Sequence, residues 1–582
     1  MSTIMMDESI HRAKDYAENL DRPIGYLRRI SISKDLASVF RKPILQSYLD
    51  KMWNKILIRR ELVIDISIVI FLVIISCTFF WYFVVPSPTH TGDIISDLYP
   101  AELLSSGQGI NIYNPVNEDY KTYGFAPYGN YRTPTELYTN TFPGEISFYA
   151  LVISIFGYNS FFLVSGFFGG ICVASTFFLV KGYTDSRKWG LFGAFILLSM
   201  PVFAKWSVDN FSNIIMVTFF LLATCSVFLI RSDRRFFVTG LLLSIAVFIR
   251  PDAIILAIPF LILFYFEKSE KMSYVKFLVP LLFVIAILYP VMDYLLYNDA
   301  LFLGGQCGVT WPLINSGYPN GVRVPWIFNM GFSLDSIGTS TLYFLGSSFA
   351  FPLLVPSIVG SYTMGPKYRT YPLFVVSVAV CLILFYGRDT STYGFFQMDL
   401  HSSFLRYMLP LYVILPIGVI GLLLWVKNHL RKWVHLVAIA IVIVLIVASF
   451  SIAILFQPYG LIDLNHKEEI ILEGKADVLN ATGVDDIFIS DIYGRKLLFP
   501  ERQNIFYLPR VPSDIRESET DQIIIQSLDL NISVYLVLSI HDQGSLQMLE
   551  YLQEKYNLEY LNLEKVVGVE VFIILGLATQ HY

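Results

Sequence analysis

The feature that most limits how this chain can fold is a series of apolar blocks, most of them 15 to 25 residues long, separated by polar segments. About 20 apolar helical residues cross the ~30 Å hydrocarbon core of a membrane. Only 15% of the 582 residues are charged and the mean hydropathy is +0.57, whereas about a quarter of a soluble protein is charged. We therefore predict a mainly α, polytopic membrane helical bundle of about eleven spans. The apolar blocks are 61–85, 160–181, 187–205, 210–231, 235–249, 252–266, 275–296, 341–361, 370–387, 406–426 and 433–457.

Basic residues decide the orientation of these spans. Residues 1–60 contain 12 Lys or Arg against 7 Asp or Glu, and a positive segment before a first span lies in the cytoplasm. The five short basic loops then also face the cytoplasm, and the long connections and the tail lie outside. The basic loops are near 181–188, 231–235, 268–276, 367–369 and 427–432, and the long connections are 86–159, 297–340 and 388–405.

This orientation depends on residues 145–157, an apolar segment of 13 residues within the first long loop. At 1.5 Å per residue it reaches only ~20 Å, which is too short to cross. Counting it as a span would also invert all five basic loops. We interpret it as a helix that lies along the outer membrane surface.

The composition changes at about residue 458. Short β-rich runs at 486–490, 533–538 and 569–575 alternate with helical stretches near 466–480 and 544–555. The sequence therefore predicts three parts, namely a cytoplasmic segment 1–60, a membrane domain 61–457 and a small extracytoplasmic α/β domain 458–582. The last part is a candidate for binding an acceptor.

The first outer loop, 86–159, contains candidates for acid–base chemistry. Asp93 and Asp97 are four residues apart and would share one helical face, and Tyr99 and Glu145 lie on the same side of the membrane. A carboxylate beside aromatic rings suits deprotonation of a hydroxyl group. The alternative is a loop whose acids are merely solvated.

Charged residues also occur at span ends on the predicted outer side. Asp209 occupies a tight turn, Arg250 and Asp252 flank the helix-breaking Pro251, and Arg406 precedes Tyr407 at the start of a span. A charge at membrane depth is costly and usually functional. The alternatives are a helix cap at Asp209, a structural ion pair for Arg250, and snorkelling of Arg406 to the interface. His401 lies in the loop before Arg406.

The order of these motifs resembles the C-type (GT-C) membrane glycosyltransferase family, in its family 39-like branch of protein O-mannosyltransferases and aminoarabinose transferases. The resemblance covers roughly residues 60–457. It is carried by Gly92-Asp93, a Pro143 turn that opens the interfacial helix, Phe156-Gly157-x-Asn159, Val208-Asp209-Asn210, Arg250-Pro251-Asp252 and Arg406-Tyr407-x-Leu409-Pro410. The family's paired prolines are replaced here by Phe142-Pro143-Gly144, and the neighbouring basic residue is absent.

The resemblance implies a polyprenyl-phosphate or dolichyl-phosphate sugar donor and inversion at the sugar carbon. Asp93 matches the family's proposed general base, and Asp209 matches a second acid near the acceptor or a metal. The departures leave open how the phosphate is held and which sugar is moved.

The leaving phosphate needs no general acid, because it is already acidic, but its charge must be stabilised. Arg250 and Arg406 are the candidate phosphate-binding residues. No cofactor is required. A divalent metal ion is compatible with the chemistry, with His90, His401 and Glu145 as candidate ligands.

Other partners and functions are less well supported by the sequence. Four of the five cysteines lie in apolar blocks and Cys307 is alone in a loop, which argues against a disulfide framework, and no dense basic tract indicates nucleic-acid binding. The main alternative function is a transporter or flippase of a glycan or lipid-linked substrate. Against it, inverted-repeat halves are lacking and the polar residues gather on one face. A non-catalytic assembly subunit is a third interpretation.

Overall fold

The computed structural model describes most of the chain in two compact units, Met1–Ile68 and Val69–Tyr582. The residues described are 42–86, 92–110, 112–113, 115–122, 124–125, 130–133, 136–138, 141–297, 334–346, 351–364, 368–386, 403–456, 460–511, 515–540, 542–563 and 569–577. The described residues of the first unit form the beginning of helix α3 (Lys42–Tyr82), and this helix continues into the second unit.

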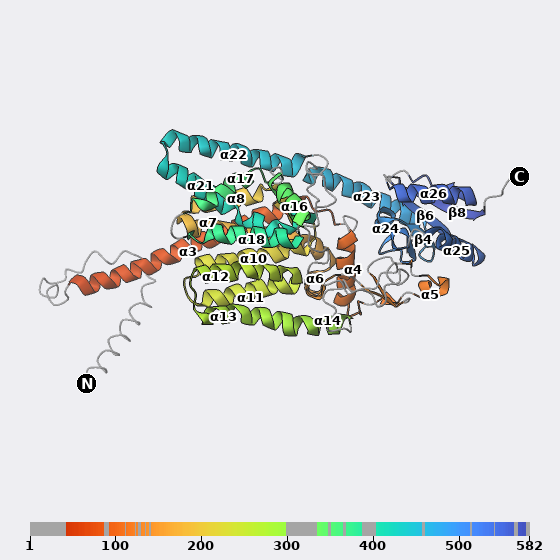
Figure 1. The fold of residues 1–582 in the computed structure, drawn as a ribbon, viewed down its shortest axis with the longest axis horizontal. Coiled ribbons are helices and arrows are strands. Elements are labelled where there is room, and N and C mark those ends of the chain that lie inside the picture. Colours follow the sequence, from red (N-terminus) through yellow and green to blue (C-terminus); the bar gives the residue numbers. More distant parts are fainter. Residues whose placement is uncertain are drawn as a thin grey trace, which may run out of the picture. The chain divides into compact units, whose positions relative to one another are not determined.

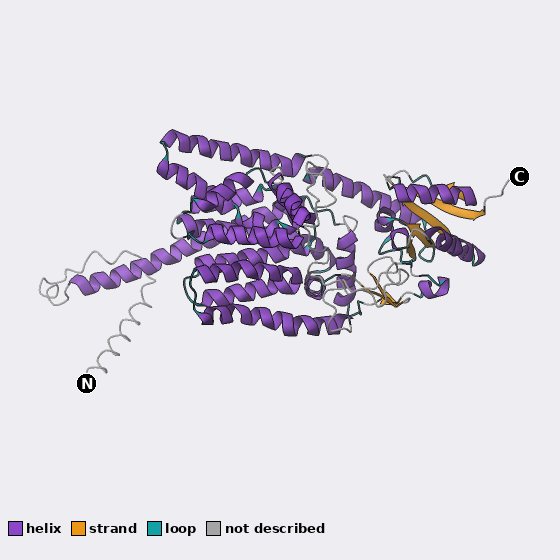
Figure 2. Cartoon of the chain, in the orientation of Figure 1, coloured by secondary structure: helices purple, strands orange, loops and turns teal. Residues whose placement is uncertain are grey.

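Long helices make up the membrane domain of the second unit (Figures 1 and 2). In chain order they are α7 (Phe161–Thr184), α8 (Arg187–Leu198), α9 (Pro201–Val208), α10 (Ser212–Leu229), α11 (Arg234–Ile249), η3 (Pro251–Leu256), α12 (Ala257–Phe266), α13 (Lys271–Phe283), η4 (Val284–Leu288), α14 (Tyr289–Tyr297), α16 (Leu334–Gly346), α17 (Leu354–Tyr362), α18 (Tyr371–Tyr386), α19 (Ser403–Tyr407), α20 (Leu409–Ile414), α21 (Pro416–His429) and α22 (Lys432–Leu455).

Helix length refines the predicted set of eleven spans. Within the described residues, six helices are long and apolar enough to cross a membrane, or up to seven if one bent pair counts as a span. The other four predicted blocks correspond to shorter helices. Blocks 235–249, 252–266 and 370–387 become α11, η3 with α12, and α18, while 341–361 falls on two helices, α16 and α17.

The bent pair corresponds to the predicted block 187–205, which the structure divides into two helices. α8 ends at Leu198, α9 begins at Pro201, and the two helices are bent by 69°. Pro201 lacks a backbone N–H and occupies the first position of α9, where no such donor is needed. The chain therefore turns here and directs Lys205, Trp206 and Asp209 along a new axis.

The predicted break between the 235–249 and 252–266 blocks is confirmed. α11 ends at Ile249, and Arg250 has an extended backbone with φ −137° and ψ 109° before η3 starts at Pro251. A residue before proline is forced out of the helical region. The same local rule therefore ends the helix and exposes Arg250 to side chains from other helices.

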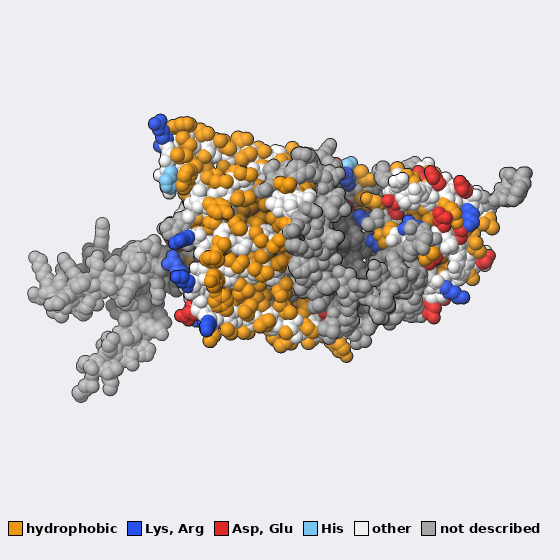
Figure 3. All heavy atoms as spheres, viewed as in Figure 1, with side chains coloured by type: hydrophobic (Ala, Val, Ile, Leu, Met, Phe, Trp, Pro, Cys, Tyr) orange, Lys and Arg blue, Asp and Glu red, His pale blue; other side chains and the backbone are white. Residues whose placement is uncertain are grey.

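The surface of the membrane domain carries a broad apolar band (Figure 3). Its large exposed side chains include Phe283, Leu295, Trp433 and Val444, which are 52%, 68%, 61% and 65% exposed. Lys and Arg side chains gather at one end of the helical bundle. A belt of this kind is stable only against lipid or another apolar surface.

The first long loop, residues 86–159, which the sequence predicts to lie outside, has its own secondary structure. It consists of α4 (Gly92–Ser105), β1 (Ile112–Tyr113), α5 (Val116–Tyr120), β2 (Asn130–Thr133), β3 (Glu136–Tyr138) and α6 (Pro143–Phe156). The three strands form a small antiparallel sheet in the order β1-β3-β2. α6, with 14 residues, corresponds to the predicted interfacial helix and packs against α4.

The C-terminal region is an α/β domain, as the sequence predicts. Its elements are α23 (Leu461–Ala481), β4 (Ile487–Ser490), α24 (Ile492–Leu498), β5 (Ile505–Tyr507), η8 (Leu508–Arg510), α25 (Arg516–Asp529), β6 (Val534–Ser539), α26 (Gln543–Lys555), β7 (Tyr556–Tyr560) and β8 (Val569–Leu577).

One five-stranded sheet, ordered β5-β4-β6-β8-β7, forms the centre of this domain. β5, β4 and β6 are parallel, and β8 runs antiparallel to β6 and β7. Alternate residues of a strand face opposite sides, so Ile487 and Ile489 pack with α25 and α26 while Phe488 packs with α23 and α24. Helices thus cover both faces.

Candidate active site

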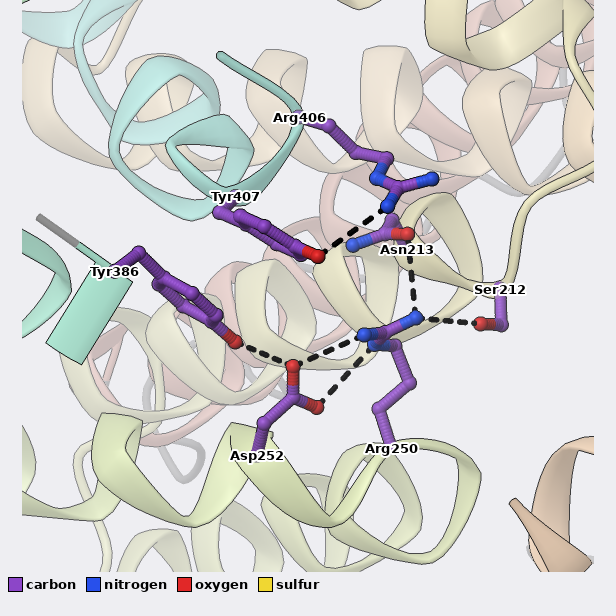
Figure 4. Close-up of polar contacts among 7 residues, drawn as sticks. All are labelled: Ser212, Asn213, Arg250, Asp252, Tyr386, Arg406 and Tyr407. Carbon is purple, nitrogen blue, oxygen red and sulfur yellow. Dashed lines mark hydrogen bonds and ion pairs between the residues drawn. The ribbon is translucent and has the colours of Figure 1, made fainter. Parts of the chain in front are cut away.

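Arg250 is held by side chains from three segments of the membrane domain (Figure 4). Its Nε and Nη2 donate to Oδ1 and Oδ2 of Asp252 at 3.2 and 3.1 Å. Its Nη1 donates to Ser212 Oγ at 3.3 Å and Asn213 Oδ1 at 3.4 Å. The ring of Phe142 lies under the guanidinium at 5.2 Å. The structural alternative foreseen for Arg250, an ion pair with Asp252, is therefore present together with neutral partners.

Arg406 occupies an aromatic environment nearby. It is only 7% exposed, and its guanidinium lies 4.5 Å from the Phe211 ring, 5.3 Å from Trp206 and 5.2 Å from Tyr407. Its Nη2 donates to the Tyr407 hydroxyl at 3.3 Å. Arg406 is therefore buried within protein rather than extended to the interface, and its cation–π contacts are strengthened by loss of water.

Two stacked tyrosines connect these arginines. The rings of Tyr386 and Tyr407 lie 4.1 Å apart with an interplanar angle of 7°, and the Tyr386 hydroxyl donates to Asp252 Oδ2. A continuous set of contacts thus runs from Arg406 through both tyrosines and Asp252 to Arg250. We call this set the arginine cluster. It comprises Ser212, Asn213, Arg250, Asp252, Tyr386, Arg406 and Tyr407.

A pair of buried acids lies beside the cluster. Glu145 is 3% and Asp97 is 6% exposed, and Thr141 Oγ1 donates to Asp97 Oδ1 at 2.6 Å. Burial raises the pKa of Glu145, although the charge of Arg250 and hydrogen bonds from Ser212 and Asp97 oppose this rise. Glu145 and Asp97 therefore form a buried carboxyl pair beside Arg250.

Gly144 explains how α6 approaches so closely. A Cβ at this position would lie 1.7 Å from the backbone oxygen of Phe248 in α11. The proline expected at this place from the resemblance would not fit against that carbonyl. Glycine allows α6 to bring Phe142 and Glu145 to the end of α11, where Arg250 begins.

Asp209 lies in a buried ion pair with Lys205, and the two side chains are 2% and 1% exposed. Lys205 Nζ also lies 5.0 Å from the Trp206 ring, which Arg406 contacts as well. The structure thus places Asp209 close to the arginine cluster but with its charge balanced. A catalytic role for Asp209 stays a prediction.

The remaining predicted site residues either lie away from the arginine cluster or fall outside the described residues. Tyr99 lies away from the arginines, with its ring 4.9 Å from Phe499 and its hydroxyl accepting from Gln503 Nε2 at 2.9 Å. Asp93 lies in α4, but its side chain is outside the described residues, as are His90 and His401 entirely. Within the described part of the chain, no group of three or more His, Cys, Asp or Glu residues could hold a metal ion.

Sequence reasoning missed Ser212, Asn213, Thr141 and Tyr386. Three are small polar residues that occur throughout apolar helices, where they commonly satisfy backbone groups. Tyr386 ends α18 at a position where an aromatic residue is ordinary at a membrane interface. Only their placement opposite Arg250, Asp97 and Asp252 distinguishes them.

Part of the chain matches the model of a known protein family. Residues 146–294 match the model of the family described as dolichyl-phosphate-mannose-protein mannosyltransferase. No curated protein sequence matches the chain.

Among solved structures, the chain is similar to ArnT from Cupriavidus metallidurans bound to undecaprenyl phosphate. The TM-score is 0.50 with 10% identity over 88% of this chain and 97% of that one. The apo form of the same enzyme gives a TM-score of 0.49 with 11% identity, covering 87% of this chain and 98% of that one. Arabinofuranosyltransferase AftD from Mycobacteria gives 0.45 with 12% identity, covering 88% and 40%.

The family match covers α6 to α14, the segment that supplies Glu145, Ser212, Asn213, Arg250 and Asp252. The fold likeness extends over most of the chain. The comparisons therefore show a family match over residues 146–294 and a fold shared with ArnT over most of the chain.

Proposed function

We propose that this protein transfers a sugar from a polyprenyl- or dolichyl-phosphate carrier to a hydroxyl acceptor at the outer face of the membrane, with inversion at the sugar carbon. The observation that carries the proposal is the arginine cluster, in which Arg406, 7% exposed, and Arg250, with a side chain 12% exposed, are connected through two stacked tyrosines. A buried pair of acids lies beside them. The matched family description and the ligand of the ArnT structure both name a lipid phosphate, which supports this donor class.

The arginine cluster suits a phosphate because its donors are charged, preorganised and shielded from water. Charge-assisted hydrogen bonds from arginine to phosphate are about twice as strong as neutral ones, and they gain strength at low dielectric. Asp252 occupies two guanidinium positions of Arg250, while in the described part of the chain Nη1 donates to the neutral Ser212 and Asn213. A lipid phosphate would bind at Nη1 and at Arg406, with Asp252 holding the far side of the guanidinium.

The transfer step follows from this arrangement. The acceptor oxygen forms a bond to the anomeric carbon from the side opposite the phosphate, and the carbon–oxygen bond to the phosphate breaks. The electron pair leaves with the lipid phosphate, where Arg250 and Arg406 stabilise the charge. The acceptor proton passes to the carboxylate of Asp93, the proposed base. Such a step needs no metal ion.

The distribution of basic residues supports the proposed side of the membrane. Lys and Arg gather at one end of the bundle (Figure 3), where the loops between α7 and α8, α10 and α11, and α21 and α22 lie. Cytoplasmic loops carry this excess. The first outer loop, the arginine cluster and the C-terminal domain would then face outward.

The test uses purified full-length protein and a polyprenyl-phosphate sugar labelled in the sugar. We expect Asp93→Asn to lower sugar transfer by about 10²- to 10⁴-fold, the usual contribution of a general base. Asp119→Asn, an exposed acid of the same loop, is the matched control and should keep wild-type activity. Full activity of Asp93→Asn would remove this residue as the base.

The transporter alternative makes a different prediction for the same variant. Uptake of a labelled lipid-linked sugar into proteoliposomes would continue in Asp93→Asn, since no hydroxyl is deprotonated during transport. Uptake by the wild-type protein without any transfer to an acceptor would overturn the enzyme assignment.

A further inference from the structure

We propose that the C-terminal α/β domain positions the acid-bearing helix α4 for catalysis, rather than serving first as an acceptor-binding module. The kinetic test of this positioning role rests on the proposed function, whereas the structural test does not. It starts from two places where the first outer loop contacts the C-terminal domain.

The first contact is an insertion of the loop into the hydrophobic core of the domain. Tyr120 and Phe125, which are 4% and 0% exposed, belong to the same buried cluster as strands β4 and β6. The Tyr120 hydroxyl is hydrogen-bonded to Ser527 in α25 at 2.9 Å. Phe125 pairs with Phe506 of β5 as an antiparallel bridge. Residues 116–125 therefore behave as an added element of the domain.

Gly124 shows how closely this insertion fits. A Cβ at position 124 would lie 1.9 Å from the Phe506 ring, and the Gly124 backbone oxygen accepts from Tyr507 N at 2.8 Å. Any side chain here must displace a buried ring of the domain. By contrast, a Cβ at Gly109, earlier in the same loop, would meet nothing within 4 Å.

The second contact is made by α4 itself. The Tyr99 ring meets the edge of Phe499, and its hydroxyl accepts from Gln503. Asp97, two residues earlier, accepts from Thr141 on the side of the membrane domain. Residues two apart on a helix are about 200° apart around its axis, so one face of α4 contacts the domain while the opposite face carries Asp97.

Contacts on two opposite faces of α4 hold Asp97 in place. Asp93, the proposed base, is four residues before Asp97 in the same helix. Asp97 is hydrogen-bonded to Glu145, whose carboxyl interacts with Ser212 and Arg250. The domain therefore presses the acid face of α4 toward the arginine cluster. A misplacement of about 1 Å at a reacting group costs about 10²-fold in rate, so release of α4 should lower kcat.

The first experiment measures the loop insertion without using activity. Bridge partners have Cα atoms about 4.5–5.5 Å apart, which a disulfide can span. A Phe125→Cys/Phe506→Cys pair in a Cys307→Ser full-length protein should oxidise readily, as read by mass spectrometry. Gly124→Val is tested in the protein that keeps Phe506, because its clash is with the Phe506 ring. It should speed hydrogen–deuterium exchange of the Tyr507 amide, which donates to the Gly124 oxygen, at least about fivefold, whereas Gly109→Val should not. An equal exchange rate in both variants, or no disulfide in the cysteine pair, would overturn the insertion.

The second experiment measures kinetics at the α4 contact. We expect Tyr99→Ala to lower kcat about tenfold or more with unchanged KM for the lipid donor, since the arginine cluster is untouched. Tyr99→Phe keeps the ring contact with Phe499 and should recover most of kcat. Gly124→Val should lower kcat in the same way.

The outcomes separate the possible failures. Unchanged kcat in Tyr99→Ala, or a rise only in KM for the acceptor, would overturn the positioning role in favour of acceptor binding. If Gly124→Val does not fold, the Tyr99 pair decides the question. If the wild-type protein transfers no sugar while the disulfide still forms, the proposed function fails and the insertion stands.

Discussion

Two largely buried arginines, one in each region of the molecule, are held in different ways. Arg502 in the C-terminal domain donates to the backbone oxygens of Leu479 at 2.7 Å and Thr482 at 2.6 Å. These carbonyls are at the C-terminal end of α23, where the helix dipole favours a cation. Within the described residues, the guanidinium of Arg250 in the membrane domain donates to side chains, those of Asp252, Ser212 and Asn213.

The kind of partner, backbone or side chain, decides what each arginine can do. Backbone carbonyls cannot turn away without unwinding α23, so Arg502 is a fixed cap. Side-chain partners can rotate, so the donors of Arg250 can pass to an incoming anion at little cost to the fold. Burial alone therefore does not identify a ligand site, whereas burial with exchangeable partners does.

The largest effect is expected at Arg250. Arg250→Lys keeps the positive charge beside Asp252 but loses the planar fork that binds two oxygens at once. We expect transfer from the lipid-linked donor to fall by about 10²-fold, the scale of one lost preorganised donor, with a normal thermal unfolding curve. The matched control is Arg235→Lys, which keeps its ion pair with Glu267 at the other end of α11 and should stay active.

A smaller effect, on stability rather than activity, is expected at Arg502. Arg502→Lys leaves carbonyls of Leu479 and Thr482 with fewer donors, and each lost bond to a charged group is worth about 1.5–3 kcal/mol. We expect the free energy of unfolding to fall by about 2 kcal/mol, measured by thermal denaturation of the full chain. Activity per folded molecule should not change. A large loss of kcat with normal stability would contradict the comparison.

The smallest effect is expected at Tyr386. Tyr386→Phe keeps the stack on Tyr407 but removes the hydrogen bond to Asp252. One neutral donor is worth about 0.5–1.5 kcal/mol, so KM for the donor should rise about threefold to tenfold while kcat is nearly constant. Tyr265→Phe, a 71% exposed residue of α12, is the control. No change in either constant would place Tyr386 outside the phosphate site.

Local sequence signals predicted the elements that depend on neighbouring residues. The break at Arg250-Pro251 follows from the steric effect of proline, and the strands near 486–490 and 533–538 follow from their β-branched and aromatic residues. The bend between α8 and α9 was missed because an apolar run hides the stop at Pro201.

The candidate site was only partly predictable. Arg250, Arg406, Asp252 and Glu145 could be chosen one by one because charge is costly in or near a membrane. Their partners could not be chosen, since serine, asparagine and tyrosine are common in membrane helices. The packing of Tyr99 against the C-terminal domain also has no local signal, because it joins segments 400 residues apart.

The amino-acid sequence by itself determined that this chain is a helical membrane protein with a C-terminal α/β domain, because hydrophobic length and periodicity are local properties. Only the tertiary structure decided which charges meet. Arg250, Tyr386 and Arg406 lie on helices far apart in the chain, and their contacts exist only after those helices pack. The same holds for Tyr120 and Phe125, which enter the core of a domain that is synthesised hundreds of residues later.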